Sequence, residues 1–298
     1  MLFRRALAGL LLLFIAPWST AGAGQTFDKG LLWRIERDGV APSYVFGTIH
    51  VTDERVMDVP VPVTEALSHS DTAVFELLIT PDMHAELARH MLFSDGTRLS
   101  NLTGKELFAS TSDVARGYGI IPTVLEMVKP WALVALFSSP PGETLRQSSG
   151  EPVLDAWLQD EARRQGMTLL ALEEPDEQIA ALEGMAMDEQ IALLRATVEN
   201  KEAVDRTFSE TLQFYLDRDL AGLEGLMGDD PESGLDADVL ENFNQRLILT
   251  RNDTMAERLL PVMAKGSVFA AVGALHLPGD NGLLQQLADA GYTVTAVY

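Results

Sequence analysis

The chain has 298 residues and carries 44 aspartate and glutamate residues against 22 lysine and arginine residues, a formal net charge of −22. This excess argues against nucleic acid or an anionic membrane surface as partner, because both would be repelled. Hydrophobic residues make up 47% and charged residues 22%, which is typical of a globular protein. The chain contains no cysteine, which excludes disulfides, thiol catalysis and thiolate metal sites.

Residues 1–23 have the three parts of a secretory signal peptide. Arg4 and Arg5 precede an apolar run over residues 6–16, and the small residues 21–23 form a cleavage site. The apolar run is short for a bilayer span, so an uncleaved anchor is the less favoured alternative. We therefore expect a periplasmic or secreted bacterial protein with no stable membrane anchor after cleavage.

The remaining chain, residues 24–298, alternates strands and helices at both ends and is almost wholly helical in the middle. This pattern predicts an α/β fold with a mixed or mostly parallel sheet and a large helical insertion, roughly residues 81–150 and 175–265. β-Rich apolar runs predict strands over 31–35, 44–46, 72–78, 167–172, 267–272 and 292–297. Helical patterns cover 60–68, 82–93, 105–118, 123–136, 153–165, 175–185, 188–217, 237–265 and 281–290, and loops are predicted over 138–142, 147–150 and 228–234.

Two segments share the order strand, Gly-x-x-His, helix, strand. The first reads Gly47-Thr48-Ile49-His50, and the second reads Gly273-Ala274-Leu275-His276. We interpret them as diverged copies of one unit, which would place the ends of their strands at one edge of the sheet, where ligands usually bind. The other histidines lie in helical patterns without a partner at metal-binding spacing and are expected on the surface: His69, His84 and His90.

Two glutamates lie at equivalent positions of predicted strands. Glu76 is inside an apolar run, where a charge is costly unless it is paired or bound to a metal; otherwise it faces solvent on an edge strand. Glu173 ends another strand, although it or Glu174 could equally be a stabilising charge at the start of the next helix. Two imidazoles and one or two carboxylates at strand ends are a suitable ligand set for a divalent metal.

Further motifs occur in order along the chain between the two Gly-x-x-His segments. They are Val74-Phe75-Glu76, Leu154-Asp155, Leu172-Glu173 with Gln178, and Arg251-Asn252-Asp253-Thr254-Met255. Over about residues 29–298 this ordered set resembles the TraB/GumN family, whose animal members are the Tiki proteases. The resemblance implies an α/β fold similar to that of erythromycin esterases and ChaN haem-binding proteins, and, for Tiki-like members, metal-dependent peptide hydrolysis. The chain departs from the family at Glu173-Glu174-Pro175, where a small polar residue more often follows the first glutamate.

The favoured prediction is a periplasmic metal-dependent hydrolase, preferably a peptidase. His50, His276 and either Glu76 or Glu173 would hold manganese, cobalt or zinc, which would lower the pKa of a bound water and polarise the scissile carbonyl. The remaining glutamate would act as general base. Arg251 and Asn252 would stabilise the developing oxyanion or a substrate carboxylate, although each alone also fits a polar helix face.

Three alternatives remain open from the sequence. In the first, a His–Glu pair activates water without a metal, as in an esterase. In the second, an envelope protein binds haem or another small ligand, with His50 or His276 as axial ligand. In the third, the chain is an accessory protein without chemistry of its own. The substrate, a peptide or a small molecule, and the oligomeric state are left open.

Overall fold

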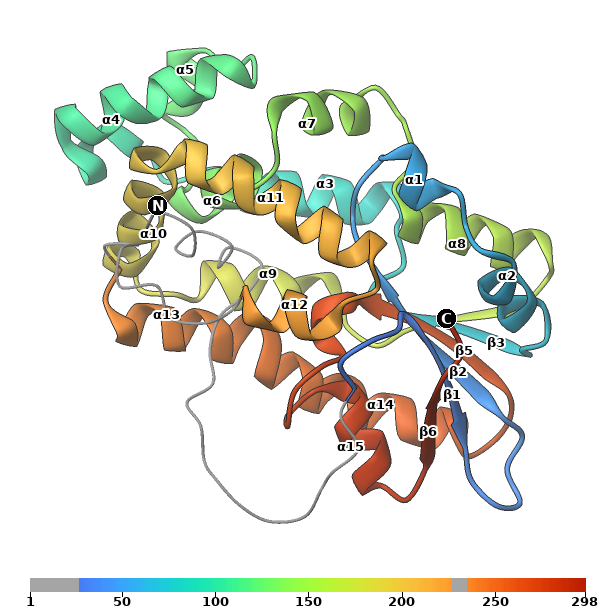
Figure 1. Cartoon of the computed structure of the whole chain (residues 1–298). Helices are drawn as coiled ribbons and strands as arrows, with labels where there is room; N and C mark the ends of the chain where they lie inside the picture. Colours follow the sequence, from blue (N-terminus) through green and yellow to red (C-terminus); the bar gives the residue numbers. More distant parts are fainter. Residues whose placement is uncertain (1–26, 227–234) are drawn as a thin grey trace.

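The centre of the molecule is a six-stranded sheet with the strand order β4-β3-β5-β2-β1-β6 (Figure 1). The structure is a computed structural model that describes residues 27–226 and 235–298, so the predicted signal peptide and the predicted loop over 228–234 lie outside the described residues. Each predicted strand is present, with ends that differ by a few residues. The strands are β1 (Leu32–Glu36), β2 (Ser43–Thr48), β3 (Thr72–Phe75), β4 (Thr168–Ala171), β5 (Val268–Gly273) and β6 (Thr293–Ala296).

The sheet is mixed and mostly parallel, as predicted. Strands β4, β3, β5 and β2 are parallel neighbours, and β1 runs antiparallel to both β2 and β6. Strand β5 is central and its first five residues are buried, as expected for an apolar strand that is covered on both faces. Helices cover both faces of the sheet (Figure 1). These are α2 (Val61–Ser68) and α8 (Leu154–Arg164) on one side, and α14 (Thr250–Met263) and α15 (Leu283–Asp289) on the other.

The two predicted strand–helix–strand units are interleaved in this sheet. The first runs from β2 through α1 (Glu54–Met57) and α2 to β3, and the second runs from β5 through a 3-10 turn (Ala274–His276) and α15 to β6. Strand β5 lies between the two strands of the first unit. Both Gly-x-x-His segments are therefore brought to the carboxyl ends of neighbouring parallel strands.

Most of the remaining helices form a body with a hydrophobic core of its own, whereas the buried leucines of the short helix Leu220–Gly225 belong to the core around the sheet. Buried side chains such as Trp131, Phe137, Leu194 and Phe243 belong to this second core, separate from the core around the sheet. Because α3 follows β3 and α9 follows β4, these helices lie beyond the carboxyl ends of the strands (Figure 1). They are α3 (Pro81–His90), α4 (Leu99–Gly117), α5 (Pro122–Leu125), α6 (Pro130–Phe137), α7 (Pro141–Ser148), α9 (Pro175–Glu183), α10 (Met187–Glu199), α11 (Lys201–Leu216), α12 (Leu220–Gly225) and α13 (Ala237–Asn244).

Proline explains two differences from the predicted helices. The single helix predicted over 123–136 is divided into α5 and α6, because the residue before Pro130 is held in an extended conformation and Pro130 begins a new helix. The loop predicted over 138–142 and 147–150 is wrong where α7 replaces it, since Pro141 occupies the first helical position. In the described part of the chain, no helix combines the length and the apolar character that crossing a membrane requires.

Candidate active site

Four predicted site residues lie at the carboxyl ends of four neighbouring strands. In the order of the sheet, Glu173 follows β4, Glu76 follows β3, His276 follows β5 and His50 follows β2. Because these strands are parallel, all four residues lie at one edge. Glu173, Glu76 and His276 are buried, with 2%, 8% and 4% of their surface exposed, whereas 55% of the His50 side chain is accessible. His50 therefore lies at the mouth of the site.

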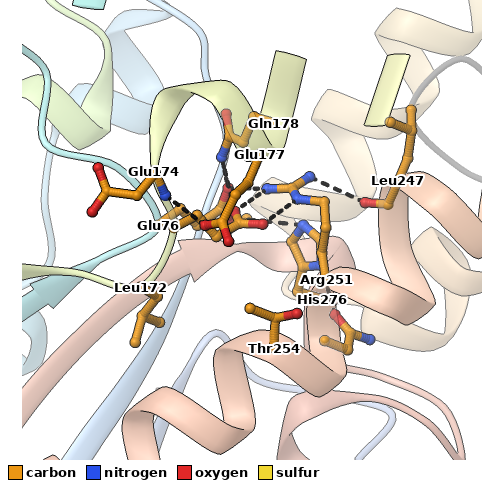
Figure 2. A network of polar contacts seen from close by, with 12 residues as sticks. Glu76, Leu172, Glu174, Glu177, Gln178, Leu247, Arg251, Thr254 and His276 are labelled. Carbon is orange, nitrogen blue, oxygen red and sulfur yellow. Dashed lines mark hydrogen bonds and ion pairs between the residues drawn. The ribbon is translucent and has the colours of Figure 1, made fainter. Parts of the chain in front are cut away.

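The position of Glu173 settles which of two adjacent glutamates points inward. Glu173 faces the site, while Glu174 is exposed and caps the start of α9 together with Glu177. Figure 2 shows the Glu174 side chain directed away from Arg251. Strand β3 is shorter than predicted and ends at Phe75, so Glu76 lies just past the strand and points into the site. It is not a solvent-facing residue of an edge strand.

Arg251 joins the two inward glutamates (Figure 2). Its Nε lies 2.8 Å from Glu173 Oε1, and its Nη2 lies 2.8 Å from both Glu173 Oε2 and Glu76 Oε2. Gln178 Nε2 also donates to Glu173 Oε2, at 2.9 Å. Both oxygens of Glu173 thus accept hydrogen bonds from within the protein. The geometry makes Glu173 the anchor of the arginine and leaves Glu76 Oε1 as the carboxylate oxygen not bound by Arg251.

The direction of Arg251 follows from an irregular turn in its helix. Residues Gln245–Leu249 form a π-helical turn between α13 and α14, inside the stretch that the sequence predicts as one helix. A wide turn of this kind changes the register of the residues that follow, and such turns are frequent at functional sites. Arg251 Nη1 donates to the carbonyl oxygen of Leu247 at 3.0 Å, so this turn also holds the guanidinium group.

Gly273 gives Glu76 and His276 the room to face each other. Glu76 Oε1 accepts a hydrogen bond from the Gly273 N–H and lies 3.7 Å from His276 Nε2. A Cβ atom on Gly273 would lie 3.2 Å from Glu76 Oε1 and 3.5 Å from His276 Cδ2, in the space that these groups need. The glycine of the first motif serves packing instead: a Cβ on Gly47 would lie 2.8 Å from Leu277 Cδ1.

The hydrogen bonds of His276 define which ring nitrogen carries the proton. Asn252 Nδ2 donates to the Asn281 carbonyl oxygen at 2.9 Å, so Asn252 Oδ1 is the atom that accepts from His276 Nδ1, at 2.6 Å. The Nε2 lone pair then faces Glu76. Burial, together with the charge of Arg251, lowers the pKa of His276 to about 3. The ring is therefore neutral at pH 7.

Asn252 lies beside His276 and does not contact the carboxylates of the site. It is 1% exposed, and both polar atoms of its amide are engaged by His276 and Asn281. Of the predicted pair, Arg251 alone retains contact with the carboxylates of the site.

His50 has a different kind of partner. Its Nδ1 lies 2.8 Å from Asp155 Oδ2, and Asp155 Oδ1 accepts from Thr48 Oγ1 at 2.7 Å. The Asp155 carboxylate raises the pKa of His50 to about 9, so the ring is protonated at pH 7. Sequence reasoning included Asp155 in a family motif but gave it no role. The two residues are 105 positions apart, and only the fold shows that they meet.

Helix α7 fixes the loop that carries His50. Glu143 is 2% exposed and accepts hydrogen bonds from Thr52 N at 2.7 Å and Thr52 Oγ1 at 3.1 Å. Arg146 Nε also binds Thr52 Oγ1, at 2.7 Å, and Gln147 Nε2 donates to the His50 carbonyl oxygen at 3.1 Å. This contact could not be predicted, because the sequence pattern indicated a loop in place of the helix.

The charge of Glu76 is stabilised by its surroundings. Burial would raise the pKa of Glu76, but its neighbours His276, Arg251 and His50, with the N–H of Gly273, lower it overall to about 2. Glu76 is thus an anion at neutral pH. The site combines this anion with a neutral imidazole and an arginine that another carboxylate holds in place.

One pair of atoms has the spacing of metal ligands. Two ligands that each lie about 2.1 Å from a tetrahedral metal are about 3.4 Å apart. The 3.7 Å between His276 Nε2 and Glu76 Oε1 is close to this value, and both atoms present lone pairs. His50, which follows the neighbouring strand β2, is the other imidazole of the predicted set, while Glu173 is bound to Arg251. One imidazole and one carboxylate therefore fit a divalent ion.

A second group of potential ligands lies elsewhere, between α3 and α9. It consists of Glu86, His90 and Asp176, which each offer one ligand atom, and these three atoms lie within 4.8 Å of one another. No other group of this kind was found among residues 27–226 and 235–298. His90 Nδ1 lies 2.7 Å from Glu183 Oε2, and His90 Nε2 lies 3.3 Å from Glu86 Oε1. His90, expected on the surface without a partner at metal-binding spacing, is partly exposed and has carboxylate partners. Its two ring nitrogens already face carboxylates, as in an ordinary ion-pair network.

Comparison with known proteins places the chain in a family. The sequence profile of the TraB/PrgY/gumN family matches residues 31–296. The chain is 29% identical over 317 residues to "Metalloprotease TIKI1" of Xenopus tropicalis, which covers 89% of this chain and 61% of that protein. The human protein of the same name is 28% identical, with the same coverage, and "Uncharacterized protein YbaP" of Escherichia coli is 22% identical over 82% of this chain and 87% of its own length.

The chain spans about three fifths of the length of its metalloprotease relatives. No solved structure matches it. The profile match covers nearly all of the described residues, including both Gly-x-x-His segments, both inward glutamates and Arg251. The chain belongs to the TraB/PrgY/gumN family.

Proposed function

We propose that the protein is a metal-dependent hydrolase that cleaves peptide bonds, and that its reaction takes place at the carboxyl edge of the sheet. The observation that carries this proposal is the pair His276 Nε2 and Glu76 Oε1, 3.7 Å apart, with the proton of the imidazole on the far nitrogen. The printed name of the animal relatives, metalloprotease, supports the same class of reaction. Export to the periplasm by residues 1–23 is part of the proposal.

His276 and Glu76 would hold the ion, which is manganese, cobalt or zinc; His50 would have to move toward them to become a third ligand, because the ligand atoms of the three residues do not all lie within 4.8 Å of one another. When bound, such an ion polarises the scissile carbonyl and lowers the pKa of a water ligand toward neutrality. Glu173 has another task in this proposal, because its two oxygens bind Arg251. Of the two glutamates that the sequence left open, Glu76 is therefore the ligand and Glu173 the anchor.

The other residues of the site orient charge and protons. Arg251 is fixed by Glu173 and is 16% exposed at its side chain, so it can stabilise negative charge that develops on a substrate oxygen. Asp155 accepts the Nδ1 proton of His50, which leaves Nε2 as the ring nitrogen that does not face Asp155. Because Asp155 also favours the protonated ring, binding of an ion by His50 releases a proton, and affinity should increase as the pH rises toward 9.

The His50–Asp155 pair favours one second candidate, a hydrolase without a metal. In that case the protonated His50 acts as general acid at the mouth of the site, and Glu76 orients the attacking water. The two candidates differ in their response to chelation, since only the first loses activity when divalent ions are removed.

The test counts metal in purified protein after loading with manganese, cobalt or zinc and removal of free ions. Wild type is compared with His50→Ala and His276→Ala, and with His90→Ala as a matched control from the second group of potential ligands. We expect about one ion per chain in wild type and in His90→Ala, and loss in the other two. Circular dichroism verifies that each variant is folded.

Activity on a peptide mixture is then measured with and without chelator. Cleavage that stops on chelation and returns with the ion supports the proposal. Loss of metal in His90→Ala but not in His276→Ala would move the metal to the group between α3 and α9. Absence of binding by any of the three ions, with activity that survives chelation, would favour the second candidate.

A further inference from the structure

The two histidines of the site are held by chemically different partners. His50 Nδ1 faces a carboxylate, Asp155, at 2.8 Å, whereas His276 Nδ1 faces an amide, Asn252, at 2.6 Å. Both contacts lie on the side of the ring away from Nε2. A carboxylate and an amide carbonyl can each accept the Nδ1 proton, but only the carboxylate adds a charge. The pairing of His276 with a neutral acceptor calls for an explanation of its own.

Asn252 can act only as an acceptor toward His276. A free amide group could turn either its oxygen or its nitrogen to the ring, and the two orientations would select opposite tautomers. Here Asn252 Nδ2 donates to the Asn281 carbonyl oxygen at 2.9 Å, which leaves Oδ1 for the imidazole. Asn252 is 1% exposed and His276 is 4% exposed, so water does not compete for these atoms. The loop at Asn281 thus sets the proton position on His276.

Neighbouring residues of α14 therefore serve the site in two ways. Arg251 binds the carboxylates of Glu76 and Glu173, while Asn252 binds the imidazole that faces Glu76. With the proton on Nδ1, the ring directs a lone pair at Glu76 Oε1, 3.7 Å away. With the proton on Nε2, the same ring would donate to Glu76 and would have no lone pair for an ion between them. The position of one proton decides between these two states.

We propose that Asn252 is a positioning residue that fixes His276 as the Nδ1–H tautomer and so reserves Nε2 as a ligand atom. The expected effect on metal affinity rests on the proposed function, whereas the assignment of the His276 tautomer is independent of it. In metal sites, a ligating histidine usually donates its other N–H to an acceptor of this kind, and removal of that acceptor lowers metal affinity about 10–100-fold. Asn252 contacts neither substrate nor ion in this role.

The test observes the proton directly, by 15N–1H correlation spectra of the histidine side chains in the 15N-labelled full chain. With five histidines in the sequence, the signals of His276 are identified by their absence in His276→Gln. Asn252→Leu removes the acceptor, and Asn252→Asp retains one. Asn242→Leu is the matched control, because Asn242 also has both amide atoms engaged, by Glu189 and Arg246, outside the site.

We expect the Nδ1–H pattern for His276 in wild type and Asn242→Leu, and a shift to the Nε2–H form in Asn252→Leu. Cobalt affinity should be about 10–100-fold weaker in Asn252→Leu, and Asn252→Asp should restore the Nδ1 proton and the affinity. The proposal is overturned if folded Asn252→Leu keeps the Nδ1–H pattern, or if wild type shows Nε2–H. If neither wild type nor any variant binds metal, the proposed function fails. The NMR measurement of the His276 tautomer then still tests the role of Asn252.

Discussion

Removal of the Arg251 side chain tests whether the two inward glutamates depend on one cation. The substitution Arg251→Met keeps an unbranched apolar chain but deletes the guanidinium group. It removes three hydrogen bonds of 2.8 Å to carboxylate oxygens and leaves Glu76 and Glu173 as buried anions. We expect a folded but clearly less stable protein whose loss of stability depends on pH.

The expected loss of stability is limited by the adjustment of the buried charge that requires the least free energy. Hydrogen bonds to charged groups contribute about 1.5–3 kcal/mol each, so three would give about 4.5–9 kcal/mol if nothing adjusted. Uptake of one proton by a glutamate with an ordinary pKa costs about 3.7 kcal/mol at pH 7 and limits the loss. We therefore expect about 3–5 kcal/mol at pH 7, the usual cost of breaking a buried ion pair.

The pH dependence gives the sharper measurement. In wild type the pKa of Glu76 is lowered to about 2, so its charge contributes stability at pH 7 and loses it only as the pH falls through that value. In Arg251→Met, the free energy needed to protonate Glu76 decreases as the pH falls. The difference in unfolding free energy between the two proteins should be about 2.7 kcal/mol smaller at about pH 5 than at about pH 7.

The assay is urea denaturation followed by circular dichroism at both pH values. Arg251→Met/Glu173→Gln is the companion variant, because a neutral amide beside Met needs no counter-charge and should recover most of the loss. A loss of unfolding free energy below about 1 kcal/mol, or an equal loss at both pH values, would show that Arg251 does not stabilise the charges of Glu76 and Glu173.

Two further predictions concern other groups of the site. Asp155→Asn should return the pKa of His50 from about 9 toward 6.5; the stability advantage of wild type should be complete below 6.5 and disappear as the pH rises through 9. Titration of His50 by NMR and thermal unfolding at about pH 6 and about pH 9.5 check this, and an unchanged midpoint would contradict it. Gly273→Ala should displace Glu76, which lies 3.2 Å from the added Cβ, and cost about 1–3 kcal/mol of stability together with most metal binding. Gly225→Ala, where nothing lies within 4 Å, is the control, and equal effects of the two would refute the argument.

The strands were the part of the fold most open to prediction. Apolar β-rich runs identified all six, because central parallel strands are buried on both faces and tolerate few polar residues. The order of the strands could not be predicted, since β5 pairs with β3 across 196 residues of chain and with β2 across 225. Helix ends were less predictable: Asn200 divides the helix predicted over 188–217, and nothing in the hydrophobic pattern marks it.

The sequence was sufficient to name candidate residues of the site, but it did not show which of them are in contact. His50, His276 and Glu173 could be named because each follows an apolar strand, and Glu76 because it is a charge inside an apolar run. Their partners could not be assigned, because a contact such as that of His50 with Asp155 depends on how helices pack against the sheet.

The roles of adjacent residues were equally hidden. Arg251 and Asn252 are neighbours in the sequence, and the pattern suggested one shared task. The π-helical turn before them and the hydrogen bond from Asn252 to Asn281 give them different ones. Neither feature has a signal in the hydrophobic periodicity.

The central place of β5 has a consequence for how the protein is made. During synthesis β2 and β3 leave the ribosome long before β5, which begins at Val268 and must insert between them. Pairing across so many residues is slow, because a long loop must close before any contact forms. Until then the facing edges of β2 and β3 are open to other chains, and His276 does not yet exist. The candidate site is therefore completed only after β5 has been made, and a chain that stops before Val268 does not contain it.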